Sequence, residues 1–189
     1  MDWILASASP RRRELLAELI QNFKIIPAKG EERIEGNPTP EVLVKELAFH
    51  KAKEVASLKE SEGKIVLGAD TVVAFEGKVL GKPKDEADAF RMLSLLSGNV
   101  HQVYTGVCIL SPKADGTQGV LLEADCTEVV FETLSEEEIR AYVATGSPMD
   151  KAGAYGIQDG GLVKEIKGSF SNVVGLPLEL CEKMIKKMI

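Results

Sequence analysis

Short β-rich runs and amphipathic segments alternate along the chain, which predicts an α/β protein. Helical spacing of apolar residues begins after Ser9, Thr39, Asp85 and Ser135, and each of these residue types is a preferred helix N-cap. A last helix is predicted from residues 176–177 to the end of the chain. The β-rich runs of the first half are residues 3–6, 23–27, 65–67, 72–75 and 78–80.

The second half of the chain contains longer β-rich runs. Residues 102–110 and 120–131 are joined by a loop with Asp115-Gly116, so they predict an antiparallel pair. Residues 162–166 and 170–174 predict a final pair of strands. Early strands that alternate with helices, followed by antiparallel strands, indicate a mixed β-sheet with flanking helices.

The start of the first helix combines the features of an anion-binding site. Ser9 caps the helix, Pro10 suits its first position, and Arg11, Arg12 and Arg13 follow directly. Unpaired N–H groups, the positive end of the helix dipole and the arginines converge there, and phosphate is the favoured anion. The apolar stripe of this helix consists of Leu15, Leu16, Leu19 and Ile20. Because Arg12 lies near the centre of that stripe, it is predicted to face the sheet. The competing interpretation is an ordinary helix start with solvated arginines.

The composition narrows the classes of function. The chain has 189 residues, 44% hydrophobic and 28% charged, and we expect residues 1–189 to form a single domain. A formal net charge of −6 argues against general electrostatic binding to nucleic acid or to an anionic membrane. No stretch is long and apolar enough to span a bilayer, and no secretory pattern is present. Cys108, Cys126 and Cys181 match no zinc or disulfide spacing, so a reducing, cytoplasmic location is expected.

Acidic and basic residues at the ends of predicted elements supply the candidate chemistry. Asp70 lies between apolar β-rich runs, where an unpaired carboxylate is costly. Glu31 and Glu32 lie on a polar segment, and Lys82 follows the hairpin after Asp70. Each of them alone is also compatible with a turn or a solvated surface charge. Carboxylates, a divalent cation and basic side chains together form the usual set for attack of water on a phosphate chain, so phosphoanhydride hydrolysis is favoured.

Other catalytic systems are not apparent in the sequence. The chain lacks both a G-x-S-x-G motif and a Walker A motif. His50 lies inside a predicted helix, and His101 is interpreted as a residue at the entry of a strand rather than a base. Cys126 lies in a predicted strand and is interpreted as a core residue rather than a nucleophile.

Five motifs stand in a fixed order along nearly the whole chain. They are Ser-Ala-Ser-Pro-Arg-Arg at 7–12, Glu-Glu at 31–32, Gly-Ala-Asp-Thr at 68–71, Gly-Lys-Pro at 81–83 and Asp-Lys-Ala-Gly-Ala-Tyr-Gly-Ile-Gln at 150–158. In this order they resemble the Maf family, whose members are nucleoside triphosphate pyrophosphatases that use a divalent metal ion. The resemblance implies an elongated mixed sheet with two lobes around a central cleft, similar to that of the inosine triphosphatase group.

The resemblance also implies roles for single residues. Asp70 matches the catalytic base, and Lys82 matches a lysine that neutralises charge on the phosphates. Glu32 matches an acidic residue that holds the metal together with Asp70, and the adjacent Glu31 is the less favoured choice. The phosphate-contacting positions are Ser9, Arg12 and Lys51.

Three further positions predict the substrate. In the family branch that prefers dTTP and UTP, arginine follows Ser-Pro, threonine follows the catalytic aspartate and glutamine follows Gly-Ile. These positions are Arg11, Thr71 and Gln158 here. The glutamine amide offers both a donor and an acceptor, which matches the imide edge of a pyrimidine. A sister branch that prefers a methylated guanine nucleotide differs at these positions, so dTTP and UTP are the expected substrates, with modified pyrimidine nucleotides as further candidates.

Two other functions stay open at this point. One is a non-catalytic, nucleotide-sensing regulator of cell division and septum formation, against which the intact acidic and lysine positions argue. The other is a phosphatase that releases orthophosphate. The expected partner is a small-molecule nucleoside triphosphate rather than a nucleic acid polymer or a membrane. The metal is expected to be Mg²⁺, Mn²⁺ or Co²⁺, and the resemblance implies that the chain can form a homodimer.

Overall fold

Strands of both orientations form one mixed sheet along the length of the molecule. The computed structural model describes residues 2–30, 34–113 and 115–188. The strands are β1 (Trp3–Leu5), β2 (Phe23–Ile25), β3 (Ile65–Phe75), β4 (Lys78–Leu80), β5 (Val100–Pro112), β6 (Gln118–Phe131) and β7 (Val163–Lys167). Their order is β2-β1-β3-β5-β6-β7, with β4 beside the upper part of β3. β1 is parallel to β2 and β3, and every other pair is antiparallel.

Six α-helices and four short 3₁₀ turns accompany these strands in the described part of the chain. The helices are α1 (Pro10–Leu19), α2 (Pro40–Ala56), α3 (Glu86–Leu96), α4 (Glu136–Ala144), α5 (Phe170–Val174) and α6 (Leu178–Lys186). The 3₁₀ turns are η1 (Lys59–Ser61), η2 (Ser147–Asp150), η3 (Ala152–Ala154) and η4 (Ile157–Asp159). The predicted N-caps Ser9, Thr39, Asp85 and Ser135 each accept a backbone N–H, and Ser135 forms a complete capping box with Glu138.

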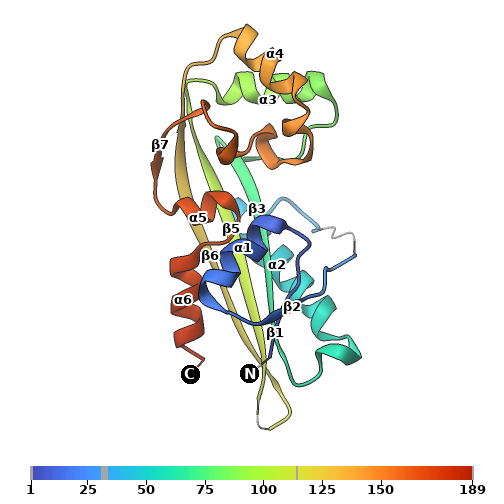
Figure 1. Ribbon diagram of the computed structural model, residues 1–189. Helices are drawn as coiled ribbons and strands as arrows, with labels where there is room; N and C mark the ends of the chain where they lie inside the picture. The colour runs from blue at the N-terminus through green and yellow to red at the C-terminus, as the bar shows by residue number, and fades with distance from the viewer. Residues whose placement is uncertain (1, 31–33, 114, 189) are drawn as a thin grey trace.

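The long strands β3, β5 and β6 extend through two lobes (Figure 1). The lower lobe of that view contains β1, β2, α1, α2 and α6, and the upper lobe contains α3, α4 and the 3₁₀ turns that follow α4. The chain ends both lie at the lower lobe (Figure 1). The expected elongated mixed sheet with flanking helices is therefore confirmed.

Each lobe has its own hydrophobic packing. In the lower lobe, Ile4 packs with α2 on one face of the sheet, whereas Trp3 and Leu5 pack with α1 and α6 on the other, as the alternation of a strand requires. The upper cluster joins α3, α4 and the ends of the long strands around the fully buried Phe131. The cleft described below lies where these packed regions meet.

Two glycines allow α2 to lie unusually close to the sheet. A Cβ atom on Gly68 of β3 would lie 2.5 Å from the carbonyl oxygen of Ala48, and one on Gly106 of β5 would lie 2.1 Å from that of Val44. Neither distance is tolerated between non-bonded atoms, so only glycine fits at these crossings. This close approach brings Lys51 of α2 to Asp70 of β3.

The structure corrects three sequence-based predictions. Residues 170–174 form the short helix α5 rather than a strand, because Ser169 caps it and the Asn172 amide donates to Val103 O and Thr127 Oγ1 on the sheet. Residues 65–75 form one continuous strand, since the pairing with β5 continues through Asp70. Cys126 is exposed rather than in the core, because the strand pleat turns it away from the face on which Thr127 meets α5.

Candidate active site

A cleft of about 280 Å³ lies between the lobes and collects the predicted site residues. Eight of the nine predicted site residues line it, and they come from both lobes. The lower lobe contributes Ser9, Arg11, Arg12, Lys51, Asp70 and Thr71, and the upper lobe contributes Lys82 and Gln158. The ninth position, Glu32, and its alternative Glu31 lie outside the described residues.

The N-terminus of α1 opens onto the lower side of this cleft. Ser9 Oγ accepts the Arg12 backbone N–H at 3.4 Å, and Pro10 occupies the first turn. The Ser9 N–H donates to Ser7 Oγ at 3.2 Å, which fixes the turn between β1 and the helix. The remaining N–H groups of the first turn and the dipole of α1 favour a negative ligand at this point.

Arg12 faces the sheet, as its position in the helical pattern predicts. Its Nε donates to Gly175 O at 2.8 Å, Nη2 donates to Thr71 Oγ1 at 3.0 Å, and Nη1 donates to Ser7 Oγ at 3.4 Å. Burial lowers the pKa of Arg12, and the charge of Asp70 opposes that shift. The guanidinium nevertheless stays protonated at any physiological pH, so it is a cation held rigidly at the floor of the cleft.

Thr71 is joined to Arg12 rather than pointing freely into the cleft. Its hydroxyl accepts from Arg12 and lies 2.9 Å from Thr105 Oγ1, which in turn donates to Asn172 O at 3.1 Å. Since the Thr105 proton goes to Asn172, the Thr71 hydroxyl donates to Thr105. This chain of hydrogen bonds connects α1, β3, β5 and α5 in one polar layer beneath the cleft.

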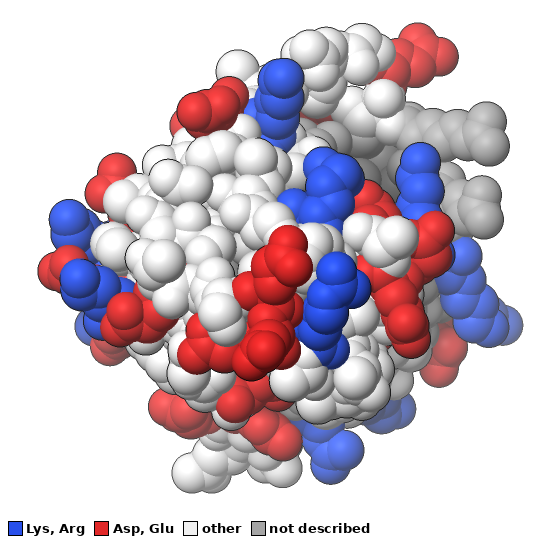
Figure 2. All heavy atoms as spheres, turned by 90° about the horizontal axis from the view of Figure 1, so that it is seen from above, with Lys and Arg blue, Asp and Glu red and all other residues white. Residues whose placement is uncertain are grey.

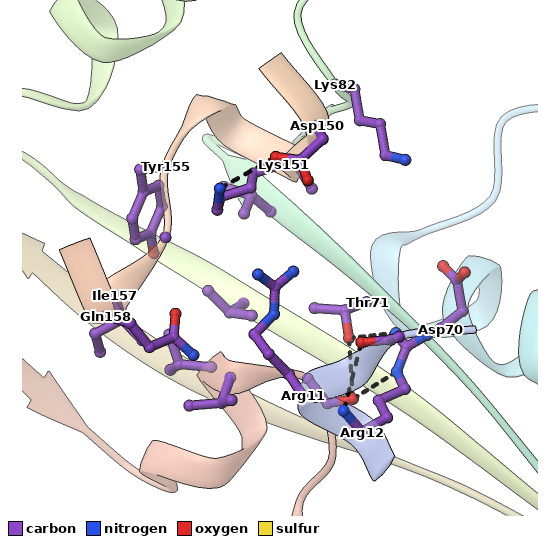
Figure 3. A pocket seen from close by; sticks show the side chains of 18 of the residues that line it. Arg11, Arg12, Asp70, Thr71, Lys82, Asp150, Lys151, Tyr155, Ile157 and Gln158 are labelled. Carbon is purple, nitrogen blue, oxygen red and sulfur yellow. Dashed lines mark hydrogen bonds and ion pairs between the residues drawn. The ribbon is translucent and has the colours of Figure 1, made fainter. Parts of the chain in front are cut away.

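Arg11 extends into the open space of the cleft, toward Asp150 and Lys151 (Figure 3). The pKa of Asp150 is lowered chiefly by its hydrogen bond with Lys151, and the charge of Arg11 contributes a smaller part. The neighbouring arginines therefore differ in role: Arg12 is anchored in the lower lobe, and Arg11 reaches across to the upper lobe. Arg13 is exposed and lines no part of this cleft.

Asp70 and Lys51 form an ion pair within the cleft. Lys51 Nζ donates to Asp70 Oδ1, and the two side chains are only 26% and 15% exposed. Asp70 is fixed from below because its backbone pairs with Gly106 in the centre of the sheet. The sequence alone did not indicate this pair, since Lys51 occupies a helix position that looks solvated.

The upper lobe presents two lysines of different character. Lys151 Nζ donates to Ser147 O, Ser147 Oγ and Asp150 Oδ1 at 2.6, 3.0 and 3.1 Å, which uses all three of its N–H groups. Lys82 Nζ has no hydrogen-bond or ion-pair partner within the described part of the chain and points into the space above Asp70 (Figure 3). Its loop is held by the Gly153 N–H, which donates to Gly81 O at 3.1 Å. Lys82 is thus available to a ligand, whereas Lys151 is not.

Tyr155 lines the cleft, and His101 supports it from the core. His101 Nε2 lies 2.7 Å from the Tyr155 hydroxyl, and both rings pack edge-on against Phe131. Burial lowers the pKa of His101 to about 4, so the imidazole is neutral at physiological pH. His101 lies inside β5 and is fully buried, which agrees with a structural rather than a basic role.

Sequence reasoning missed several residues that shape the cleft. Asp150 and Lys151 belong to one of the five motifs but have no role that the motif itself predicts, and the sequence predicts no contact for Gly175. The signal available for the first two was a segment of small residues without a period, which is typical of a loop wrapped around a site. No sequence signal indicates that Gly175 O would accept from Arg12, 163 positions away.

The donor set fits a hard divalent cation that is shared with substrate phosphates. Asp70 and Asp150 line the cleft, and Mg²⁺ typically uses one or two carboxylates together with phosphate oxygens. Within residues 2–30, 34–113 and 115–188, no group of three or more histidine, cysteine, aspartate or glutamate side chains lies together. The described part of the cleft thus offers the Asp70 and Asp150 carboxylates to a cation, and substrate phosphates would offer further oxygen ligands.

Two solved structures share this architecture. The HAM1 protein from Coxiella burnetii matches with a TM-score of 0.53 at 16% identity and covers 99% of both chains. The Ham1 protein of Staphylococcus aureus matches with a TM-score of 0.52 at 14% identity over the full length of both chains. At these identities the likeness concerns the fold alone, and it confirms the expected mixed α/β fold of the inosine triphosphatase type.

The chain belongs to the Maf family. The model of that family, described as "Maf-like protein", matches residues 2–188. A protein of Thermococcus gammatolerans named "dTTP/UTP pyrophosphatase" is 51% identical over 183 residues, which cover 96% of this chain and 94% of the relative. A protein of Clostridium novyi with the same name is 50% identical over 192 residues, which cover 100% of this chain and 98% of the relative.

The surface agrees with a small anionic ligand. From the end of the upper lobe, acidic and basic side chains are intermixed, and no broad basic patch is visible among the described residues (Figure 2). The basic residues of the cleft thus form a local exception in a chain of net charge −6. Within the described residues, no helix combines the length and apolar character needed to cross a membrane.

Proposed function

We propose that this protein is a nucleoside triphosphate pyrophosphatase that hydrolyses dTTP and UTP to the monophosphate and pyrophosphate. The observation that carries the proposal is the meeting, in one cleft, of four features: a helix N-terminus, a half-buried arginine, a carboxylate paired with a lysine, and a lysine opposite that has no partner among the described residues. The relatives named dTTP/UTP pyrophosphatase support the same activity.

The lower lobe binds the phosphates. The N–H groups at the start of α1, the Ser9 hydroxyl and the Arg12 guanidinium present donors to phosphate oxygens. Because Arg12 is already held by Gly175 and Thr71, it needs no reorganisation when charge develops on those oxygens. Lys82 approaches from the upper lobe and neutralises the same charge.

Asp70 acts as the general base. It accepts a proton from the attacking water, the water oxygen forms a bond to the α-phosphorus, and the bond from that phosphorus to the bridging oxygen breaks. Pyrophosphate leaves with the electron pair of the broken bond. Lys51 orients the Asp70 carboxylate through their ion pair and lies within reach of a bound phosphate.

Asp70, together with Glu32 outside the described residues, would hold the divalent cation. When bound, such a cation supplies positive charge to the phosphate chain and lowers the cost of the developing negative charge. Its identity among Mg²⁺, Mn²⁺ and Co²⁺ stays a prediction.

The base is read by the cleft side formed by Arg11 and Gln158. The Gln158 amide offers one acceptor and two donors, which match the carbonyl and N–H groups of thymine or uracil. Thr71 contributes indirectly, because its hydroxyl is committed to Arg12 and Thr105.

A nucleotide panel with pyrophosphate detection tests the proposal. We expect dTTP and UTP to be hydrolysed in preference to dCTP, dATP and dGTP with Mg²⁺ or Mn²⁺. The variant Asp70→Asn is expected to lose pyrophosphate release by at least ~100-fold while keeping the thermal unfolding midpoint. Normal turnover by that variant contradicts the role of Asp70, and release of orthophosphate instead of pyrophosphate contradicts the reaction.

The alternative of a nucleotide-sensing regulator without turnover is not favoured, because relatives that are similar over nearly the whole chain are named dTTP/UTP pyrophosphatase. We further infer that residues 1–189 act as one domain, since β3, β5 and β6 run through both lobes. The homodimer and the cytoplasmic location stay predictions.

A further inference from the structure

The hydroxyl of Tyr142 connects helix α4 to the loop that carries Gln158. It donates to Asp159 Oδ2 at 2.6 Å and accepts the Gly156 backbone N–H at 3.1 Å. A phenol has a single proton, and Gly156 N can only donate, so these two directions are fixed. One side-chain oxygen therefore holds the chain immediately before and immediately after Ile157-Gln158.

Two further side chains, Ser147 and Lys151, extend this contact into a polar cluster. Ser147 Oγ donates to the same Asp159 oxygen at 2.7 Å. Lys151 Nζ donates to Ser147 O and Ser147 Oγ, so η2 is joined to η4 through Asp159. The polar cluster of Tyr142, Ser147, Lys151 and Asp159 borders the cleft through Lys151 and includes neither Asp70 nor Lys82.

The hydrogen bonds of this polar cluster keep the same donors and acceptors at physiological pH. Burial and the hydrogen bond to Asp159 raise the pKa of Tyr142 to about 12, so the phenol keeps its proton. Burial alone would raise the pKa of Asp159, but the donors Tyr142 and Ser147 outweigh that effect and lower it. The charged acceptor and its donors are therefore matched, and such hydrogen bonds are among the stronger ones.

Backbone conformation shows why this loop depends on external support. η4 is a single 3₁₀ turn, and Gly160, which follows it, has a φ of +73°. Gln158 and Asp159 are exposed, so little apolar packing holds the turn. A Cβ on Gly156 would lie 2.8 Å from Lys151 Cε, which shows how closely the Lys151 side chain of the cluster approaches the backbone there.

We propose that Tyr142 is a positioning residue for base selection: its hydroxyl fixes the 156–159 backbone so that the Gln158 amide meets the pyrimidine edge. The identity of the base in this proposal rests on the proposed function, whereas the positioning of the 156–159 backbone by Tyr142 does not. A 1 Å displacement of a recognition group is enough to weaken a pair of hydrogen bonds severely.

The test compares Tyr142→Phe with the matched control Tyr104→Phe. Tyr104 lies on β5 and does not line the cleft, so the control makes the same chemical change elsewhere. For Tyr142→Phe we expect the ratio of kcat/KM for dTTP over dCTP to fall ~10-fold, through a higher KM for dTTP. The kcat for dTTP is expected to change less than about threefold, because the catalytic groups are not touched. Tyr104→Phe is expected to keep the wild-type ratio.

Hydrogen exchange separates this inference from the proposed function. In Tyr142→Phe, amide exchange of residues 156–159 is expected to accelerate ~10-fold without nucleotide, whatever the substrate is. Unchanged exchange in that segment overturns the inference, and so does an unchanged nucleotide preference in a variant of a selective enzyme. If the wild-type protein shows no preference for dTTP or UTP, the proposed function is overturned. The amide exchange of residues 156–159 still decides whether Tyr142 positions this segment.

A second variant covers the case in which Tyr142→Phe folds poorly. Asp159→Asn keeps the shape of an exposed side chain and weakens only the charged acceptor. It is expected to lower the dTTP over dCTP ratio about threefold and to accelerate exchange at Gly156 less than Tyr142→Phe does. A ratio and an exchange rate identical to wild type in Asp159→Asn contradict the inference.

Discussion

The crossing of α2 over Gly106 offers a test of how the active site is assembled. Gly106 of β5 lies beneath α2, and a Cβ there would be 2.1 Å from Val44 O and 2.4 Å from Val44 C. Ordinary contact begins at 3.4 Å, so Gly106→Ala forces α2 and the sheet apart by about 1.3 Å. A flexible side chain could rotate away from the new methyl group, but the backbone of a helix cannot.

The expected size of the effect follows from that displacement. Overpacking of a well-packed region typically costs about 1–3 kcal/mol, and a clash with helix backbone belongs at the upper end. For a chain of this size ~3 kcal/mol lowers the unfolding midpoint by roughly 6–12 °C. Lys51 lies two turns further along α2 and pairs with Asp70, so the same shift separates them. We therefore expect kcat for dTTP to fall ~10–100-fold in the protein that remains folded.

Thermal unfolding and pyrophosphate release below the unfolding midpoint measure the two effects. The control is Gly81→Ala, since a Cβ on Gly81 meets no atom within 4 Å and its φ is not positive. That control is expected to leave the midpoint unchanged or slightly higher, because alanine restricts the unfolded chain. A Gly106→Ala midpoint within 2 °C of wild type, a margin of roughly 1 kcal/mol, refutes the packing argument. A lower midpoint with full activity refutes the link from α2 to Asp70.

Three further predictions address single groups in and near the cleft. Arg12→Lys is expected to lower kcat/KM by about 100-fold for every nucleotide, because a lysine ammonium cannot replace the planar guanidinium that contacts both Gly175 and Thr71. Steady-state kinetics on a nucleotide panel measure this effect, and a loss of less than about twofold contradicts the prediction. Lys82→Ala is expected to lower kcat by about 100-fold yet leave the unfolding midpoint within about 2 °C, because its amine has no partner within the described residues. Burial holds the pKa of His101 at about 4 in the folded protein, below its unfolded value of 6.5, so unfolding takes up a proton between these pH values and stability falls as pH drops from 6.5 to 4. The free energy of unfolding, measured with urea across that pH range, is expected to change less with pH for His101→Gln than for wild type. Equal slopes of this free energy against pH contradict the assignment.

Local chemistry made much of the fold predictable from the sequence. The caps Ser9, Thr39, Asp85 and Ser135 act on backbone N–H groups within three residues, so their effect is independent of distant parts of the chain. The long antiparallel pair β5–β6 was likewise predictable from residue type and turn residues. Helix α5 was not, because the hydrogen bonds of Asn172 to Val103 and Thr127 that hold it depend on residues 69 and 45 positions away, respectively.

The candidate site was also only partly predictable from the sequence. The order of the motifs identified residues that do line the cleft, but the contacts among these residues are tertiary. The ion pair of Lys51 with Asp70 exists because Gly68 and Gly106 let α2 approach the sheet, and nothing in the local sequence around Lys51 records this. The Arg12 contact with Gly175 joins opposite ends of the chain.

The two lobes divide the work of the cleft, and this division explains why the neighbouring arginines differ. Arg12 is hydrogen-bonded within the lower lobe and lies among the groups that we propose to contact phosphate, a part common to all nucleotides. Arg11 extends across the cleft toward Asp150 and Lys151 of the upper lobe, on the segment that leads to Gln158 (Figure 3). The loop that carries Gln158 is held by Tyr142 and the rest of the polar cluster, which share no hydrogen bond with Asp70 or Lys51. Base preference can therefore change through the loop while the phosphate chemistry below it stays intact.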